Sequence, residues 1–263
     1  MAGNSEPPRP NDFFGLLADD TRWKLLVALV RSDRRVQELA HLVGQPEGVV
    51  TEHLARLRDF RIATARRSDA DHHDTYYSLD LDRLRELYLA AGAALHPALA
   101  DPRATSPRRD FQLPPLPLRV LFLCTGNSAR SQVAEALLRD LTKGQIEVYS
   151  AGTSPAPVHP LAIMAMAEMG LDISRQRPKH LDVFRGQSFD YVITVCDRVR
   201  EVCPAFPGDP SRIHWSFPDP VTVEGAEAER YRVFQQMAME MLNRLRLLLI
   251  VIEREKAEAE AAS

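Results

Sequence analysis

The first part of the chain carries apolar residues at helical spacing. Between residues 12 and 60 they recur three or four positions apart, which is the pattern of helices that bury one face. A break at Gly44 separates an expected helix over residues 36–43 from a longer one over residues 46–60. Two helices of these lengths joined by a short glycine-containing turn predict a helix-turn-helix.

A strand-like pattern follows the second of these helices. Residues 62–67 and 75–79 are short and β-prone, and the polar run between them predicts a hairpin. Helical spacing returns from residue 81 to about residue 95, in a helix suited to dimer packing. The sequence therefore predicts a mainly α-helical, winged helix-turn-helix domain over residues 12–96.

Prolines separate this domain from the remainder. Residues 97–117 hold six prolines among polar and charged residues, a composition typical of semi-rigid spacers that form no packed element. We therefore expect a linker there and a second domain over residues 118–253. A polar, proline-rich leader is expected over residues 1–11.

The second half of the chain alternates strand and helix patterns. Four apolar residues before Cys124 predict a buried strand, and further strands are expected over residues 146–149 and 189–195. Helical patterns cover residues 160–169 and, at the end of the domain, residues 231–253. Strands that alternate with helices pair in parallel, which predicts an α/β domain with a parallel sheet. Such sheets bind ligands at the carboxyl ends of their strands.

Composition and charge exclude some classes of function but do not identify one. With 263 residues and a net charge of −3, the chain has no overall attraction for polyanions, so nucleic-acid contacts must come from a local patch. No secretory signal and no apolar run of membrane-spanning length is evident, so we expect a cytoplasmic protein without membrane contact. All three cysteines lie in the second half, and this odd number favours catalysis, redox chemistry or metal binding over structural disulfides.

Residues 124–131, Cys-Thr-Gly-Asn-Ser-Ala-Arg-Ser, carry the strongest chemical signal. They join a buried strand to the start of a helix, where backbone amides and the helix dipole favour an anion. Arg130 adds a planar guanidinium matched to two oxyanion oxygens. The same field stabilises a thiolate, so we expect Cys124 to be a nucleophile rather than an inert core thiol. The residues expected to bind the oxyanion are Thr125, Gly126, Asn127, Ser128, Ala129, Arg130 and Ser131.

Two more cysteines and one aspartate are candidates for the same site. Cys196 and Cys203 have the wrong spacing for a zinc knuckle and no further ligand nearby, so we expect no metal. Cys196, at a strand end, could instead attack an adduct on Cys124 and form a disulfide with it. Cys203 could then exchange with that disulfide and move it toward the surface if the segment unwinds. Two inert thiols are the alternative. Asp219, between two prolines, is a general acid or a turn aspartate.

These motifs resemble the low-molecular-weight protein tyrosine phosphatase fold and, more narrowly, the thioredoxin-coupled arsenate reductases built on it. The resemblance covers about residues 118–250 and keeps the order and spacing of its motifs. The motifs are residues 124–131, Tyr-Ser-Ala-Gly at 149–152, the Cys196 and Cys203 pair, and His-Trp-Ser-Phe-Pro-Asp-Pro at 214–220.

The resemblance implies a role for each candidate. Cys124 would attack arsenate held by Arg130 and the loop amides, and Asp219 would protonate the departing hydroxyl. Cys196 would then attack Cys124 and release arsenite. Cys203 would attack Cys196, leaving a disulfide that thioredoxin or a similar thiol donor reduces. No bound cofactor is implied.

The resemblance also bears on a monovalent ion. Some relatives bind potassium beside the loop through side chains matching Asn127, Glu135 and Ser150, together with an aspartate. This chain has Lys179 at the position of that aspartate. Because an ammonium group can replace the ion, we expect no potassium requirement.

The first domain resembles the arsenic-repressor (ArsR) family of winged helix-turn-helix dimers. The resemblance rests on Leu-Ala-Asp-Asp-Thr-Arg at 17–22, Glu-Leu-Ala at 38–40, His-Leu-x-x-Leu-Arg-Asp at 53–59 and Tyr-Tyr-Ser-Leu at 76–79. It implies a homodimer, formed through this domain, that binds a double-stranded DNA operator. Relatives that sense arsenite often carry a cysteine pair where residues 32–37 of this chain hold none, which excludes thiol-based sensing within the domain.

The expected DNA contacts lie on the second helix of the turn and on the wing. Glu47 and Glu52 bring negative charge to that helix, while arginines there and on the wing, Arg61 among them, supply a basic footprint. A merely solvated face is the alternative. His72 and His73 at the wing tip are expected to be polar turn residues rather than metal ligands. The DNA-binding candidates are Thr51, Arg56, Arg58, Arg66 and Arg67.

The two resemblances together predict an arsenate reductase fused to a regulator of the arsenic-operon type. One alternative is a low-molecular-weight phosphatase, which needs no second thiol but usually has aromatic residues where Val221 and Thr222 follow Asp219. The other is a regulator that uses the second domain as an oxyanion or redox sensor.

Overall fold

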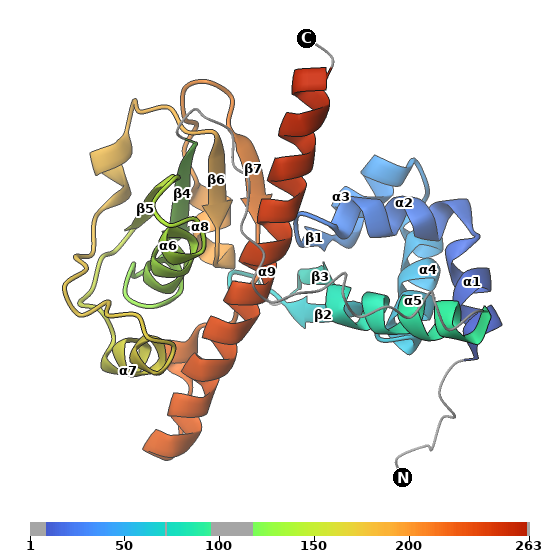
Figure 1. The fold of residues 1–263 in the computed structure, drawn as a ribbon, viewed down its shortest axis with the longest axis horizontal. Coiled ribbons are helices and arrows are strands. Elements are labelled where there is room, and N and C mark those ends of the chain that lie inside the picture. Colours follow the sequence, from blue (N-terminus) through green and yellow to red (C-terminus); the bar gives the residue numbers. More distant parts are fainter. Residues whose placement is uncertain (1–8, 72, 96–117, 262–263) are drawn as a thin grey trace. The chain divides into compact units, whose positions relative to one another are not determined.

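The computed structural model describes residues 9–71, 73–95 and 118–261 and divides the chain into two compact units, residues 1–109 and 110–263 (Figure 1). Each unit has its own apolar core. The expected linker over residues 97–117, most of the expected leader, and His72 lie outside the described residues.

The first unit is a winged helix-turn-helix, as predicted. Its three short strands form an antiparallel sheet in the order β1-β3-β2. The structure begins its first helix at residue 10, within the expected leader. The helices are α1 (Pro10–Leu17), α2 (Asp20–Leu29), α3 (Val36–Val43), α4 (Glu47–Asp59) and α5 (Leu81–Leu95), and the strands are β1 (Arg34–Arg35), β2 (Ala63–Arg67) and β3 (Thr75–Leu79).

The turn between α3 and α4 follows from Gly44. This residue ends α3 with a φ of 68°, in the left-handed region that glycine adopts without steric cost. The chain then reverses, and α4 begins after Pro46. The apolar faces of the helices meet beneath the turn, where Leu39, Leu54 and Leu57 are fully buried. The helix-turn-helix is therefore held by its own core.

The second unit is an α/β domain around a four-stranded sheet in the order β5-β4-β6-β7, with every pair parallel, as predicted. Helices α6 and α7 both pack against the long closing helix α9, and α8 packs against β4 and β6 (Figure 1). Its elements are β4 (Arg119–Cys124), α6 (Arg130–Leu141), β5 (Glu147–Gly152), α7 (Pro160–Glu168), the 3-10 turn η3 (Leu181–Phe184), β6 (Tyr191–Thr194), α8 (Asp197–Val202), β7 (Ser211–His214), the 3-10 turn η4 (Pro220–Thr222) and α9 (Glu227–Ala261).

Strand β4 lies inside the sheet and directs its carboxyl end at the candidate loop. Residues 120–123 are fully buried, since neighbouring strands and helices cover both edges and both faces. Cys124 is the last residue of this strand, and Gly152 lies opposite it at the end of β5. The site therefore forms at the edge where parallel sheets bind ligands.

Strand β7 and helix α9 are among the elements of this unit that differ from the sequence expectation. Strand β7 was not predicted because it has four residues, of which Ser211 and Arg212 are exposed, so it shows no apolar run. Helix α9 begins earlier and ends later than the expected residues 231–253, because its polar flanks favour helix but carry no apolar period. No helix in the described ranges has the length and apolarity to cross a membrane.

Candidate active site

The anion loop consists of residues 124–131 between β4 and α6. The Cys124 side chain is 2% exposed, and its Sγ lies 2.9 Å from Ser131 Oγ. The backbone amide of Asn127 donates a hydrogen bond of 3.2 Å to the same sulfur. Hydrogen-bond donors aimed at a sulfur stabilise its thiolate form. The predicted nucleophile therefore has its sulfur held at the start of the loop by contacts with Ser131 and the Asn127 amide.

Asn127 holds the loop in shape from inside. Its side chain is fully buried and its φ is 42°, a left-handed conformation that asparagine tolerates better than most residues. Its Nδ2 donates to the hydroxyls of Ser131 and Ser150, both at 2.9 Å. Its Oδ1 accepts from the Lys179 amide at 2.7 Å and from Gln132 Nε2 at 3.1 Å. One amide side chain thus ties the loop to β5 and to the segment before η3.

The segment after β5 supports the loop from outside. Amides of Ser154, Ala156 and His159 donate to the loop carbonyls of residues 125, 126 and 128, at 2.9, 2.8 and 2.8 Å. In a planar trans peptide the carbonyl and the following N–H point in opposite directions. Carbonyls that point outward therefore turn the amides of residues 126, 127 and 129 inward, toward the place of an anion.

Gly152 is needed where β5 passes the loop. A Cβ added there would clash with the carbonyl oxygen of Thr125 and lie 2.9 Å from the Asn127 amide. The loop and the strand end are therefore in backbone contact. Any larger residue at this position would push the anion loop away from the sheet.

Arg130 and Asp219 meet across the mouth of the loop. Arg130 is 5% exposed, and its guanidinium donates to the Phe217 carbonyl at 3.2 Å and to Asp219 Oδ2 at 2.7 Å. Asp219 keeps 31% of its side chain exposed, and its other oxygen accepts the Val221 amide at 3.2 Å. The candidate acid and the candidate anion ligand therefore share one small, solvent-reachable space.

Lys179 faces a buried carboxylate beside the loop. Glu135 Oε2 accepts from Ser150 Oγ at 2.6 Å and lies 3.8 Å from Lys179 Nζ, while Arg139 donates to the other oxygen at 2.7 Å. The positions matching a potassium site thus carry an internal ammonium in this chain. Potassium independence itself stays a prediction.

Cys196 lies directly beside the anion loop. It comes two residues after the end of β6, and Val195 between them donates its amide to the Leu123 carbonyl of β4 at 2.8 Å. Its Sγ is 3.4 Å from Thr125 Oγ1, and its side chain is 3% exposed. Burial raises the pKa of the Cys196 thiol, while the nearby Arg130 guanidinium acts in the opposite direction. The structure therefore brings the second thiol to the loop that begins with Cys124.

Cys203 lies at the far end of α8. Its side chain is partly buried, and this burial raises the pKa of its thiol. Six helical residues separate the two cysteines, so at about 1.5 Å per residue their Cα atoms lie roughly 10 Å apart. A disulfide needs Cα atoms within about 7 Å, so this pair can join only if α8 unwinds.

Some residues that support the site were not found from the sequence. Gln132 and His159 contact the loop but carry no motif signal. Asp197 and His214 form a buried pair next to Cys196, at 3.2 Å. An aspartate directly after the second cysteine was the available signal. In the described residues no group of three or more His, Cys, Asp or Glu side chains could hold a metal ion.

The candidate DNA contacts of the first unit lie on α4 and β2. Arg56, Arg58 and Arg67 are exposed and make no ion pair with other described residues. Arg66 instead donates to Asp69 at 3.0 Å, within the wing. The Thr51 hydroxyl donates to the Glu47 carbonyl at 2.8 Å, which leaves its oxygen able to accept.

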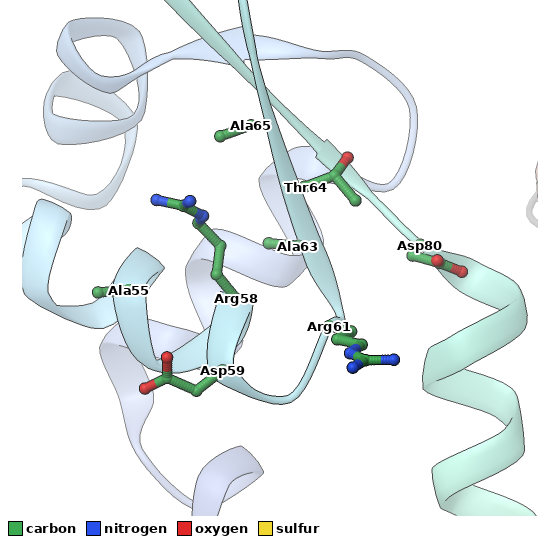
Figure 2. A pocket seen from close by; sticks show the side chains of 8 residues that line it. All are labelled: Ala55, Arg58, Asp59, Arg61, Ala63, Thr64, Ala65 and Asp80. Atoms are coloured by element: carbon green, nitrogen blue, oxygen red, sulfur yellow. The ribbon is translucent and has the colours of Figure 1, made fainter. Parts of the chain in front are cut away.

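A hollow of about 540 Å³ lies between the end of α4 and β2 (Figure 2). Arg58 and Arg61 line it together with the carboxylates of Asp59 and Asp80, and small side chains from β2 leave the space open. Arg61 has a φ of 58°, a conformation uncommon for a long side chain. The two guanidinium groups and the two carboxylates around the hollow balance in charge.

Comparison with known proteins agrees with both halves of this description. The family described as "Low molecular weight phosphotyrosine protein phosphatase" matches residues 119–258, and "Bacterial regulatory protein, arsR family" matches residues 19–65.

Curated relatives match the second unit. An arsenate reductase of Halalkalibacterium halodurans is 41% identical over 127 residues, 48% of this chain and 91% of the relative. That of Bacillus subtilis is 39% identical with the same coverage. A solved structure described as an arsenate reductase in the phosphate binding state is 30% identical, with a TM-score of 0.42, and the match covers 51% of this chain and 98% of that one. The chain therefore belongs to the low molecular weight phosphotyrosine protein phosphatase family and carries an ArsR-type helix-turn-helix ahead of that domain.

Proposed function

We propose that this chain reduces arsenate to arsenite with Cys124, Cys196 and Cys203, and that its first unit binds operator DNA. One observation carries the enzymatic part of the proposal. Cys196 Sγ lies 3.4 Å from Thr125 Oγ1, within the loop that begins with Cys124. Phosphate ester hydrolysis needs no thiol at that place, whereas reduction of a bound oxyanion does.

The first step is attack on arsenate. The oxyanion binds against the inward amides of the loop and the Arg130 guanidinium, and Cys124 Sγ forms a bond to arsenic. A hydroxyl leaves as water after taking a proton from Asp219. The ion pair between Asp219 and Arg130, at 2.7 Å, must open so that both groups face the anion.

The second step transfers two electrons to arsenic. Cys196 gives up its thiol proton, which the departing arsenic group takes, and attacks Cys124 Sγ; a sulfur–sulfur bond forms while the sulfur–arsenic bond breaks. Its electron pair goes to arsenic, so arsenic(V) leaves as arsenite, arsenic(III), and two thiols are oxidised to one disulfide. Cys203 then attacks Cys196, which restores Cys124 as a thiolate. An external dithiol of the thioredoxin type reduces the final Cys196–Cys203 disulfide.

The first unit is proposed to bind duplex DNA as a homodimer. The match to the ArsR family supports this, as do the exposed arginines of α4 and β2. The absence of cysteine from residues 1–123 means that an arsenite effector has no thiol ligand in that unit. The cytoplasm is the proposed location, since both a DNA operator and a thiol reductant are found there.

Arsenate-dependent oxidation of NADPH, coupled through thioredoxin and thioredoxin reductase, tests the enzymatic proposal. Cys196→Ser and Cys203→Ser should abolish turnover, whereas Val202→Ser, which places a hydroxyl one residue away, should not. All three variants should still hydrolyse p-nitrophenyl phosphate, because that reaction uses only Cys124 and the anion pocket. Full arsenate turnover by either cysteine variant contradicts the proposal.

Phosphatase activity is the second candidate. The arrangement of Cys124, Arg130 and Asp219 is complete for cleavage of a phosphate monoester. Val221 is 42% exposed beside the acid, where an aromatic residue would otherwise hold an aryl group of a substrate. A small, unspecific phosphatase activity is therefore expected beside the reductase, without preference for phosphotyrosine.

A further inference from the structure

We infer that Asp197, His214 and Ser216 fix the Cys196 end of α8 while its Cys203 end moves, and so act as positioning residues in the thiol relay. The inference rests on the proposed reductase function. It goes beyond it by assigning a role to a buried polar cluster.

The cluster is buried and directly bonded. Asp197 is fully buried and is the first residue of α8, and one of its oxygens, Oδ1, accepts from Ser216 Oγ at 2.8 Å and from His214 Nε2 at 3.2 Å. A carboxylate accepts only, so the His214 ring donates to it. The other ring nitrogen, Nδ1, lies 2.8 Å from the Thr194 hydroxyl, which is also buried.

These contacts hold the chain on both sides of Cys196. Thr194 precedes it by two residues, and its backbone carbonyl accepts the Trp215 amide at 2.9 Å. Asp197 follows it directly. Both flanks are therefore tied to β7 and to the residues just after β7. The sulfur of Cys196 cannot leave the anion loop without breaking these buried hydrogen bonds, and the groups that make them would then stay buried without those partners.

The Cys203 end of α8 is less deeply buried. Val202 is 62% exposed, and Cys203 is only partly buried. Segments with few buried contacts open first, since local stability follows burial. To bring the two Cα atoms from roughly 10 Å to within about 7 Å, the exposed end must therefore approach the fixed one.

The same cluster also shields the acid from this motion. Ser216 is followed by Phe217, whose carbonyl accepts from Arg130, and then by Asp219. Unwinding that started at Asp197 would pull on this segment and on the anion pocket. Unwinding from Cys203 leaves Arg130 and Asp219 in place for the next arsenate.

The test separates the first disulfide from the later steps. In a Cys203→Ser background the relay stops at the Cys124–Cys196 disulfide, so arsenite released in a single turnover reports only the attack by Cys196. Asp197→Ala removes the acceptor of the hydrogen bonds from Ser216 and His214. We expect release to slow by about tenfold or more, since a displacement of roughly 1 Å in a reacting group costs about 100-fold. Hydrolysis of p-nitrophenyl phosphate should change by less than about twofold, because it does not use Cys196.

Two further variants keep the inference falsifiable if Asp197→Ala folds poorly. Asp197→Asn keeps an Oδ1 acceptor for both donors, so its release rate should lie within about threefold of the parent. Asp140→Ala, which removes an exposed carboxylate of α6, should change neither reaction.

Three results would count against the clamp that Asp197, His214 and Ser216 form at the Cys196 end of α8. Arsenite release at the parent rate from Asp197→Ala overturns it, and so does an equal loss in release and in hydrolysis, which would mark a purely structural role. Release from Asp197→Asn as slow as from Asp197→Ala also overturns it, because charge rather than hydrogen bonding would then be responsible. Absence of arsenite from the Cys203→Ser parent itself instead contradicts the proposed function, and the clamp with it.

Discussion

Replacement of Asn127 by alanine gives the most quantitative test of how the anion loop is built. The side chain makes four hydrogen bonds at full burial, to Ser131, Ser150, Lys179 and Gln132, between 2.7 and 3.1 Å. At about 1 kcal/mol for each bond, their loss lowers the free energy of unfolding by roughly 4 kcal/mol. The φ of 42° adds about 1 kcal/mol of strain for alanine.

Asn127→Gly separates these two contributions. Glycine loses the same hydrogen bonds but adopts a positive φ freely, so it should be less destabilised than Asn127→Ala by about 1 kcal/mol. Gln145→Ala, which removes an exposed amide after α6, should change the free energy of unfolding by less than about 0.5 kcal/mol.

Urea unfolding, followed by tryptophan fluorescence, measures these differences in the second unit alone. The chain has two tryptophans, of which Trp215 is buried in the second unit and Trp23 is 56% exposed in the first. A Trp23→Phe background therefore makes the signal specific. A loss below about 1 kcal/mol for Asn127→Ala would refute the reasoning, since it would mean that the loop keeps its shape without this side chain.

Three further predictions follow from single features. Removal of potassium should leave the arsenate reduction rate unchanged, because Lys179 Nζ already lies 3.8 Å from Glu135; a rate that falls with potassium removal, measured against a sodium control, contradicts this. Burial raises the pKa of the Cys196 thiol above its ordinary 9.0, so the neutral thiol is favoured in the folded state. The second unit should therefore lose stability as the pH rises through and above the pKa that this thiol has in the unfolded chain. Cys196→Ser should lessen that loss, as urea unfolding at several pH values can measure. Arg58→Ala and Arg67→Ala should each reduce the salt dependence of binding to a duplex selected by the parent protein, by about 0.9 in the log–log slope, as fluorescence anisotropy can measure; an unchanged slope refutes the phosphate contact.

The order of elements was predictable because apolar periodicity dictates it. In the first unit the strand over residues 75–79 and the helices over residues 36–43 and 81–95 have the predicted limits. In the second unit α6 begins at Arg130, as the loop motif required. Where one face of a helix or strand is buried along its whole length, the spacing of apolar residues is sufficient to predict that element.

The supports of the site could not be predicted, because they depend on contacts between distant segments. The three amides of residues 154–159 reach the loop only after β5 has returned beside β4. Cys196 was expected near the loop, but its approach to Thr125 is set by the pairing of β6 with β4. The buried pair of Asp197 and His214 joins α8 to β7, a strand that showed no apolar run.

The chemical roles of the site residues were predictable to different degrees for the same reason. Chemistry carried by a local motif, such as Cys124 with Arg130, was visible in the sequence because one loop supplies all its parts. Chemistry that needs a second segment, such as the roles of Cys196 and Asp219, was left with alternatives by the residues and was favoured by the resemblance. The structure supplies the physical reason, since parallel pairing brings the ends of β4 and β6 to one edge of the sheet.

Disulfide mapping after one turnover tests the central claim most directly. The reduced protein is mixed with arsenate and no external thiol, then alkylated, digested and examined by mass spectrometry. The proposed relay predicts a Cys196–Cys203 disulfide in the parent chain and a Cys124–Cys196 disulfide in Cys203→Ser, each with one arsenite released. Three alkylated cysteines after exposure to arsenate, in a protein that still hydrolyses p-nitrophenyl phosphate, would contradict it.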